Sequence, residues 1–321
     1  MTGAGPTLAP VLFQPRKRTM AKLQILLIGG SGFVSGTLAR TALAAGHDVW
    51  AVTRGQRTTV AGVTPILADR RDSDALRTAL DQIDQPWDLV VDCIGYEASD
   101  AQQDVELFRQ RARQLVFIST DFVYDPAHRR FPQGEETDYY LADGYGGKKR
   151  QCELTFLHSD TGNMHWTILR PCHIYGPGSL LGCLPHHGRD PDLIAKLRRG
   201  EPLQLIGGGH FLQQPIFAAD LAQTILSCAG NSHCHQQIYL TAGPDMVESR
   251  RYYEIIAEVL GFNAQIEEVS VSAFLAAHPD RHSFACHRIY DLSKLRNHGL
   301  YVPATPITDG LRQHVESLLH A

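Results

Sequence analysis

Two side chains with complementary chemistry stand four positions apart in the segment GYGGKKRQCE, namely Tyr145 and Lys149. In a helix that begins at this segment, that spacing places both side chains on one face. A phenol has a reference pKa of about 10, and an ammonium group held beside it favours the phenolate. Tyr145 is therefore a candidate acid or base near neutral pH. Because the same spacing also occurs on ordinary solvated helices, the pair alone does not define a site.

Two hydroxyl groups lie at the end of an apolar run that precedes this pair. The segment FISTDFVYD ends a predicted strand and offers Ser119 and Thr120, the second of them 25 residues before Tyr145. Parallel sheets with helices on both faces bind their ligands at the carboxyl ends of the strands. We therefore expect these hydroxyls at the ligand-binding edge.

Four glycines stand among the eleven residues of LLIGGSGFVSG, directly behind an apolar run. Gly29 permits a tight turn, and Gly32 lets a phosphate approach the backbone amides. The helix that follows, beginning with Phe33 and Val34, supplies about half a positive charge at its N-terminus. Turns and close packing explain many glycine clusters, but the position after the first strand favours a dinucleotide diphosphate.

The end of the second predicted strand, HDVWAVTRGQR, bears on the choice of dinucleotide. NAD-binding proteins of this architecture often place a carboxylate there against the ribose hydroxyls, but Thr53 stands at that position, with Arg54 and Arg57 after it. Cations without a carboxylate favour NADP(H) over NAD(H), by at least tenfold in dissociation constant, with NAD(H) as the weaker alternative. Alternatively, Arg54 stacks on the adenine or projects into water.

The segment ILADRRD follows the third predicted strand. Its Asp69 is placed either to contact the adenine edge or to cap the helix that starts near Asp72. The predicted cofactor-binding residues are Gly29, Ser31, Gly32, Phe33, Val34, Arg54, Asp69, Arg70, Tyr145 and Lys149.

Short apolar runs alternate with helical patterns and position all of these residues. Strands are predicted at 23–28, 49–53, 64–68, 88–94, 114–119 and 165–169, and helices near 33–45, 73–84, 100–111 and 145–158. This order predicts an α/β protein with a Rossmann-type doubly wound parallel sheet. Looser segments follow, with helices near 191–199, 219–229, 249–260 and 307–319 and a strand at 265–271, and they predict a smaller C-terminal substrate-binding lobe.

The predicted domain division has three parts. Residues 1–20 are expected to form a disordered leader. Residues 21–175, with about 210–240, form the dinucleotide-binding domain, and residues 176–209 and 241–321 form the substrate-binding lobe.

The amino-acid composition limits the classes of molecule that the protein is expected to bind. The chain has 321 residues, a formal net charge of -4 and seven cysteines without Cys-x-x-Cys spacing. Such a balance attracts neither nucleic acid nor an anionic membrane, and the cysteines are typical of a reducing compartment. We expect a cytoplasmic protein with a small-molecule substrate, no membrane association and no metal; nucleic acid is not expected, and a homodimer is allowed.

In this order, the motifs resemble those of the extended and atypical short-chain dehydrogenase/reductases, the NAD-dependent epimerase/dehydratase superfamily, over about residues 22–320. The resemblance implies that Tyr145 is the catalytic acid or base and that Lys149 activates it and anchors the nicotinamide ribose. It implies that Thr120, rather than Ser119, holds the substrate oxygen. The motifs that carry the resemblance are GGSGFVSG, ILADRRD, ISTDFVYD, YGGKK, ILRPCHIYGPG and GGGHFLQQPIFAADLA.

The predicted substrate-binding residues are Asp121, His173 and Gln213, and departures from the family pattern at or beside them bear on the substrate. Asp121 matches an acidic position of sugar-nucleotide dehydratases, but Phe122 occupies the place of their second acid, which argues against dehydration. His173 stands where the family often has Asn, and it either contacts substrate or shapes its loop. Gln213 stands where nucleotide-sugar enzymes place an Arg against a diphosphate, a charge that a neutral amide cannot replace.

The resemblance implies an NAD(P)-dependent oxidoreductase or epimerase. It would act on a hydroxyl or ketone carbon of a small, sugar-like substrate by hydride transfer assisted by Tyr145, Lys149 and Thr120. One alternative is a non-catalytic dinucleotide-binding or RNA-binding protein of the same fold, since two segments look similar to the chloroplast stem-loop RNA-binding branch. A nucleotide-sugar epimerase is another.

Overall fold

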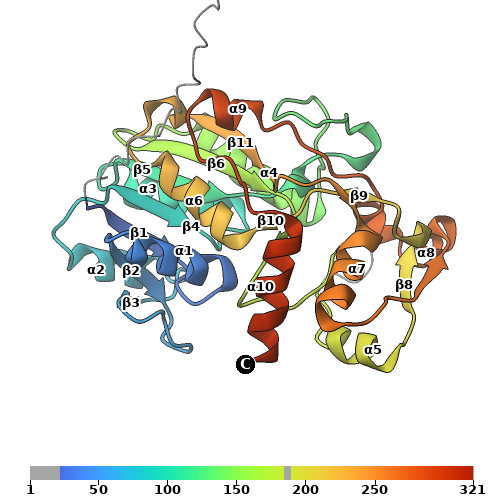
Figure 1. The fold of residues 1–321 in the computed structure, drawn as a ribbon. Coiled ribbons are helices and arrows are strands. Elements are labelled where there is room, and N and C mark those ends of the chain that lie inside the picture. Colours follow the sequence, from blue (N-terminus) through green and yellow to red (C-terminus); the bar gives the residue numbers. More distant parts are fainter. Residues whose placement is uncertain (1–21, 184–188, 321) are drawn as a thin grey trace, which may run out of the picture.

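The computed structural model describes residues 22–183 and 189–320, so the predicted leader, 1–20, lies outside the described residues. Seven parallel strands form one sheet in the order β11-β6-β5-β4-β1-β2-β3 (Figure 1). Its strands are β1 (Gln24–Ile28), β2 (Asp48–Thr53), β3 (Thr64–Leu67), β4 (Leu89–Asp92), β5 (Gln114–Ile118), β6 (His165–Pro171) and β11 (Gln237–Thr241). The predicted doubly wound parallel sheet is confirmed.

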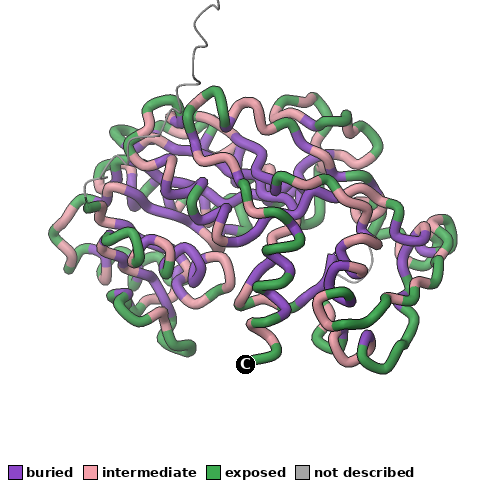
Figure 2. Tube along the Cα trace, in the orientation of Figure 1, coloured by how far each residue is buried: buried purple, intermediate pink, exposed green. Residues whose placement is uncertain are grey.

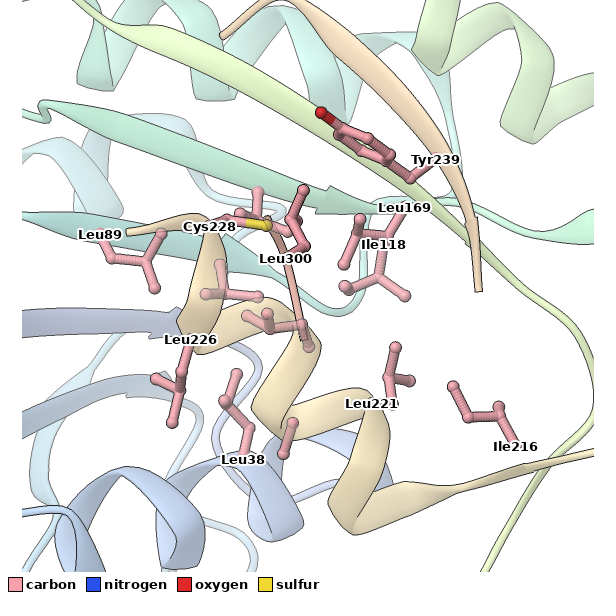
Figure 3. Packing of buried hydrophobic residues seen from close by; sticks show 14 of the residues in the cluster. Leu38, Leu89, Ile118, Leu169, Ile216, Leu221, Leu226, Cys228, Tyr239 and Leu300 are labelled. Carbon is pink, nitrogen blue, oxygen red and sulfur yellow. The ribbon is translucent and has the colours of Figure 1, made fainter. Parts of the chain in front are cut away.

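Helices cover both faces of the sheet, as an all-parallel sheet requires. In β1, Ile25 and Leu27 pack in the core that α1 and α6 cover, whereas Leu26 and Ile28 pack in the core under α2, α3 and α4. Figure 3 shows the first of these cores, where side chains of α1, α6 and the strands meet. The helices are α1 (Phe33–Ala44), α2 (Ser73–Asp81), α3 (Ala98–Phe108), α4 (Gly144–His158) and α6 (Ala218–Cys228). Because both faces are buried, the strands are nearly continuous apolar runs (Figure 2).

A smaller lobe with its own core lies beside the sheet (Figure 1). Leu193, Leu203, Tyr252 and Leu311 are buried together there. The lobe contains α5 (Leu193–Arg199), α7 (Ser249–Leu260), α8 (Val271–Ala277), α10 (Ile307–Leu319) and the parallel pair β8 (Leu203–Ile206) and β13 (Ile266–Val269). Two-residue strands join it to the sheet: β7 (Ile174–Tyr175) pairs with β10 (Ile216–Phe217), and β9 (Leu212–Gln213) pairs with β12 (Val247–Glu248).

The chain returns to the sheet after it has built most of this lobe. Tyr290, Leu295 and Leu300 belong to the same core as α6, and α9 (Ser293–Asn297) lies against β11, where Lys294 Nζ donates to the Ile238 carbonyl at 3.0 Å. The predicted domain division as a whole stays a prediction, but this segment contacts the sheet although it was assigned to the lobe.

Five short 3-10 helices occur in the connections: η1 (Asp121–Val123), η2 (Pro126–His128), η3 (Gly207–Gly209), η4 (Ser232–Cys234) and η5 (Pro279–Phe284). Among the described residues, no helix has both the length and the apolarity to cross a membrane. Six of the cysteines are free thiols: Cys93, Cys152, Cys172, Cys228, Cys234 and Cys286.

Candidate active site

A cavity of about 750 Å³ opens at the carboxyl ends of β5 and β6. Its wall combines η1 and the start of α4 with the β6–β7 connection and η5. Thr120, Tyr145, Lys149 and His173 all line it. The structure therefore brings together the three residues predicted to be catalytic and one predicted to contact substrate.

Tyr145, the second residue of α4, is 51% exposed. A Cβ on Gly146 would overlap the Phe122 carbonyl oxygen, so the glycine is what allows α4 to approach η1 this closely. The approach places Tyr145 and Thr120 at the wall of the same cavity. Burial of the phenol raises the pKa of Tyr145 to about 12, and the Thr120 hydroxyl opposes that rise. The phenol is therefore protonated at neutral pH.

Lys149 is buried below Tyr145 and connects two strand ends. Its Nζ donates to the carbonyls of Gly95 at 2.6 Å and Ile118 at 2.7 Å. Burial lowers the pKa of Lys149. The Lys149 ammonium binds carbonyls, and burial of the phenol is the largest cause of the Tyr145 shift, so the expectation that Lys149 lowers the pKa of Tyr145 stays a prediction.

Asp92 and Arg70 hold the turn that receives Lys149. Asp92 Oδ1 accepts from the backbone N–H groups of Ile94 and Gly95, both at 2.8 Å, while Oδ2 pairs with Arg70 at 2.8 Å. Arg70 also pairs with Asp104 at 3.1 Å, and all three charged residues are buried. Arg70 lines the glycine-loop cavity, but its guanidinium is already paired, so the prediction that Arg70 binds the cofactor stays a prediction.

Ser119 and Thr120 have separate partners. Ser119 Oγ donates to Glu153 at 2.6 Å, and Glu153 is paired with the fully buried Arg170 at 2.7 Å. Thr120 Oγ1 accepts from the Phe122 backbone at 3.2 Å and keeps its hydroxyl proton for Tyr145 or a ligand. This difference favours Thr120 as the group that holds a substrate oxygen.

Asp121 lies at the centre of a buried charge network. Its Oδ2 accepts from Arg129 at 3.2 Å, from Arg288 at 3.0 Å and from the hydroxyl of Tyr290. Two guanidinium groups therefore neutralise the carboxylate that lines the cavity. The predicted substrate contact of Asp121 stays a prediction, because this oxygen already has three partners.

Sequence reasoning missed the wall opposite η1. Phe284 of η5 packs against Phe122 with ring centroids 5.3 Å apart, and Arg288 Cζ lies 4.6 Å from the centroid of the same Phe122 ring. No local sequence pattern predicts that Arg288 lies here, because its partner Asp121 is 167 residues away in the chain.

The two remaining substrate-binding predictions differ in outcome. His173 lines the cavity and packs edge-to-face on Tyr252, with ring centroids 6.0 Å apart. Burial, together with the charge of Arg189, lowers the pKa of His173 to about 4, so the ring is neutral at pH 7. Gln213 is 1% exposed in β9 and is not among the residues that line the cavity.

A second cavity, of about 210 Å³, lies over the glycine loop. Gly29 has φ +92°, and a Cβ there would fall 2.6 Å from Ile94 Cγ2. Gly29, Ser31 and Gly32 line the cavity, so the loop offers a side-chain-free surface that fits a dinucleotide diphosphate. Phe33 begins α1 beside this loop, and Val34 lines the larger cavity, so the two spaces are neighbours.

Two arginines line the second cavity at the end of β2, where the adenosine ribose of the dinucleotide is predicted to bind. Thr53 is buried and accepts from the Gly55 backbone at 3.3 Å, whereas Arg54 and Arg57 are exposed at the cavity wall. Within the described residues neither arginine forms an ion pair. Asp69 also lines the cavity, but its Oδ1 accepts from the Arg71 backbone at 3.0 Å. Asp72, not Asp69, caps α2 by accepting from Ala75 at 2.9 Å.

Within the ranges that the structure describes, no group of three or more His, Cys, Asp or Glu side chains is arranged to hold a metal ion.

Comparison with known proteins adds three findings. A model of the NAD dependent epimerase/dehydratase family matches residues 25–240. The chloroplast stem-loop binding protein of 41 kDa b from Arabidopsis thaliana is 26% identical over 255 residues, which are 74% of this chain and 64% of that relative. The dTDP-4-dehydro-6-deoxy-D-allose reductase of a Streptomyces species is 23% identical over 303 residues, covering 84% of this chain and 89% of the reductase.

Solved structures agree on the fold. The UDP-N-acetylglucosamine 4-epimerase of Methanobrevibacter ruminantium, in complex with UDP-N-acetylmuramic acid, superimposes with a TM-score of 0.77 at 18% identity. The match covers 94% of this chain and 99% of that chain.

Proposed function

The chain belongs to the NAD dependent epimerase/dehydratase family and is an enzyme of the short-chain dehydrogenase/reductase type, and we propose that it interconverts a hydroxyl and a ketone on a small, sugar-like substrate with NADP(H). One observation carries the proposal above all: Tyr145, Thr120 and Lys149 line one wall of the large cavity, beside the glycine loop. Phe122 offers no second acid, which speaks against dehydration.

Each residue of the site has a distinct role in this proposal. Tyr145 is protonated at neutral pH, so it donates a proton to the substrate oxygen when a ketone becomes a hydroxyl. Thr120 donates a hydrogen bond to the same oxygen and fixes its position. Lys149 holds the ends of β4 and β5 together beneath the reacting atoms. The nicotinamide supplies the hydride when it is bound.

The preference for NADP(H) rests on Arg54 and Arg57. Both are unpaired within the described residues, and the buried Thr53 replaces the carboxylate that would repel a 2′-phosphate. A guanidinium meets a phosphate through paired, charge-assisted hydrogen bonds, each worth roughly 1.5 to 3 kcal/mol. We expect NADPH to bind at least tenfold more tightly than NADH, with a preference that weakens at high salt.

Titration of both cofactors against intrinsic tryptophan fluorescence tests this preference. Arg54→Ala should bind NADPH and NADH with similar affinity. Arg71→Ala is the matched control, because Arg71 is exposed on a neighbouring loop but does not line the cavity. Equal affinities in the wild type, or an Arg54→Ala variant that still prefers NADPH, would show that this assignment is wrong.

Turnover tests the catalytic assignment. A panel of hydroxy and keto metabolites, screened by NADPH absorbance, should yield a substrate, and Tyr145→Phe should lower kcat for it by about 10² to 10⁴ while the cofactor still binds. Tyr139→Phe is the control, because Tyr139 is 48% exposed, stacks on His128 and lies outside the cavity. Full activity of Tyr145→Phe would overturn the mechanism.

RNA binding is a second candidate, because one relative is a chloroplast stem-loop binding protein. The formal net charge of -4 gives it no general electrostatic support. A nucleotide-sugar epimerase is a third candidate, on the likeness to such enzymes, and the neutral Gln213 speaks against it. Gel-shift assays with stem-loop RNA and calorimetry with UDP-glucose would distinguish these candidates from the proposed oxidoreductase.

A further inference from the structure

The charged side chains around the large cavity differ in whether another group of the protein binds and neutralises them. Asp121 is paired with Arg129 and Arg288, and Lys149 donates to two carbonyls. Arg189 also lines the cavity but forms no ion pair with any residue that the structure describes. Its guanidinium donates to the Ile174 carbonyl at 3.5 Å, which is longer than an ordinary hydrogen bond.

Arg189 contacts the start of α1 and lines the same cavity as the reacting groups. Its guanidinium stacks 5.4 Å from the centroid of the Phe33 ring. Its charge contributes to the low pKa of His173 and opposes the rise in the pKa of Tyr145, so it acts within electrostatic range of both. It does not line either of the two smaller cavities over the glycine loop, whereas Arg40 lines one of them. Arg189 therefore lines the large cavity and neither of the two cavities over the glycine loop.

We propose that Arg189 binds an acidic group of the substrate, so that the substrate is a hydroxy or keto compound with a carboxylate or a phosphate. A planar guanidinium matches either group through two parallel hydrogen bonds. This proposal rests on the proposed function, because it assumes that the large cavity holds the substrate.

The acidic side chains of the cavity support one orientation of such a substrate. Asp143 precedes Tyr145, and Asp280 belongs to η5, which carries Phe284; both carboxylates are exposed at the cavity wall. They lie on the segments that meet around Phe122, whereas Arg189 contacts α1 and β7. Like charge disfavours an acidic group near Asp143 and Asp280, so the acid of the substrate lies toward Arg189 and its reacting carbon toward Tyr145.

Anion binding to the NADPH-saturated protein tests this proposal. Inorganic phosphate and malonate are titrated by calorimetry into the wild type, Arg189→Gln and Arg199→Gln. Arg199 is the matched control, since it lies on the following helix, is exposed and pairs with Glu201 outside the cavity. We expect the wild type and Arg199→Gln to bind at least one of the two anions. Arg189→Gln should bind that anion at least tenfold more weakly, with an NADPH dissociation constant within twofold of the wild type.

The other outcomes each contradict the proposal. If the wild type binds neither anion, or if Arg189→Gln binds them as well as the wild type does, Arg189 is not the anion site. If Arg189→Gln instead loses tenfold or more in NADPH affinity, the residue serves the cofactor. Failure of the wild type to bind any dinucleotide would contradict the proposed function itself, a result distinct from these. The two anions separate a preference for phosphate from one for carboxylate.

Discussion

Asp92 and Asp104 are both buried beside Arg70, but their pKa values shift in opposite directions. Burial raises the pKa of Asp92, but the charge of Arg70 and the hydrogen bonds that the carboxylate accepts together outweigh burial, so the net pKa is lowered. Burial and the neighbouring Asp92 charge raise the pKa of Asp104 well above its ordinary value. The raised pKa favours the protonated form of Asp104, whereas the lowered pKa of Asp92 favours the carboxylate that fixes the turn that receives Lys149.

These opposite pKa shifts predict different effects of Asn substitution at the two positions on the free energy of unfolding. The stabilising contribution of Asp104 is complete below its ordinary pKa of 3.8 and is lost as the pH rises through its higher pKa in the folded protein. Asp104→Asn avoids that loss, so its stability relative to the wild type should be greater at pH 8 than at pH 5. Asp92→Asn removes the anion that compensates Arg70 and should cost about 3 to 5 kcal/mol at pH 7.

Urea unfolding of both variants at pH 5, 7 and 8 measures these effects. If Asp104→Asn is as destabilised at pH 8 as Asp92→Asn, the carboxyl of Asp104 is ionised in the folded protein and the assignment fails.

At the same residue scale, the sequence identifies Tyr145, Lys149 and Thr120 because local rules place them: a spacing of four on a helix and a position at a strand end. It does not identify the role of Arg70. The partners of Arg70 stand 22 and 34 residues further along the chain, so only the packed fold brings their charges together.

Among the elements, η5 depends on a single side chain. Arg288 donates to the carbonyls of Phe284 at 3.1 Å and Cys286 at 3.4 Å, and its Nε binds Asp121. One buried guanidinium therefore ties the wall of the cavity to the end of β5. Through Phe122, the same contact reaches the ring of Tyr145.

Arg288→Met should loosen η5 and destabilise the protein by about 3 kcal/mol, because it leaves buried carbonyls and part of the Asp121 charge uncompensated. Urea unfolding measures the loss, and limited proteolysis reports cleavage within 279–286. Arg281→Met is the control, since Arg281 lies in η5 but is exposed. A variant that resists both urea and protease as the wild type does would show that η5 does not depend on Arg288.

Element boundaries follow the sequence where periodicity is strong. Helices α7 and α10 occupy the predicted ranges 249–260 and 307–319, because their apolar faces repeat at helical spacing. The paired strands β7, β9, β10 and β12 were missed, since two residues carry no period. The run after α8 has no local signal either: Gln133 donates to the carbonyl of Ile289, a bond between distant parts of the chain.

For the whole molecule, the alternating pattern predicts the class of the sheet, because strands buried on both faces need continuous apolar runs. It does not predict how the later chain divides between sheet and lobe. β11 completes the sheet at its edge, and Leu300 packs in the core near Leu226 and Cys228 (Figure 3). Those contacts depend on tertiary packing, which a linear pattern of apolar residues does not encode.

The core that α1 and α6 cover is completed late in the chain, by Tyr290, Leu295 and Leu300. This order affects how the protein folds while it is synthesised. A ribosome releases the sheet strands β1 to β6 long before these residues emerge, so the nascent domain holds an uncovered apolar surface beside α6 and β11 while the lobe is translated. Messages or proteolytic products that stop before Leu300 should therefore yield chains that bind chaperones or aggregate. The first core can therefore be completed only after the ribosome has synthesised the chain as far as Leu300.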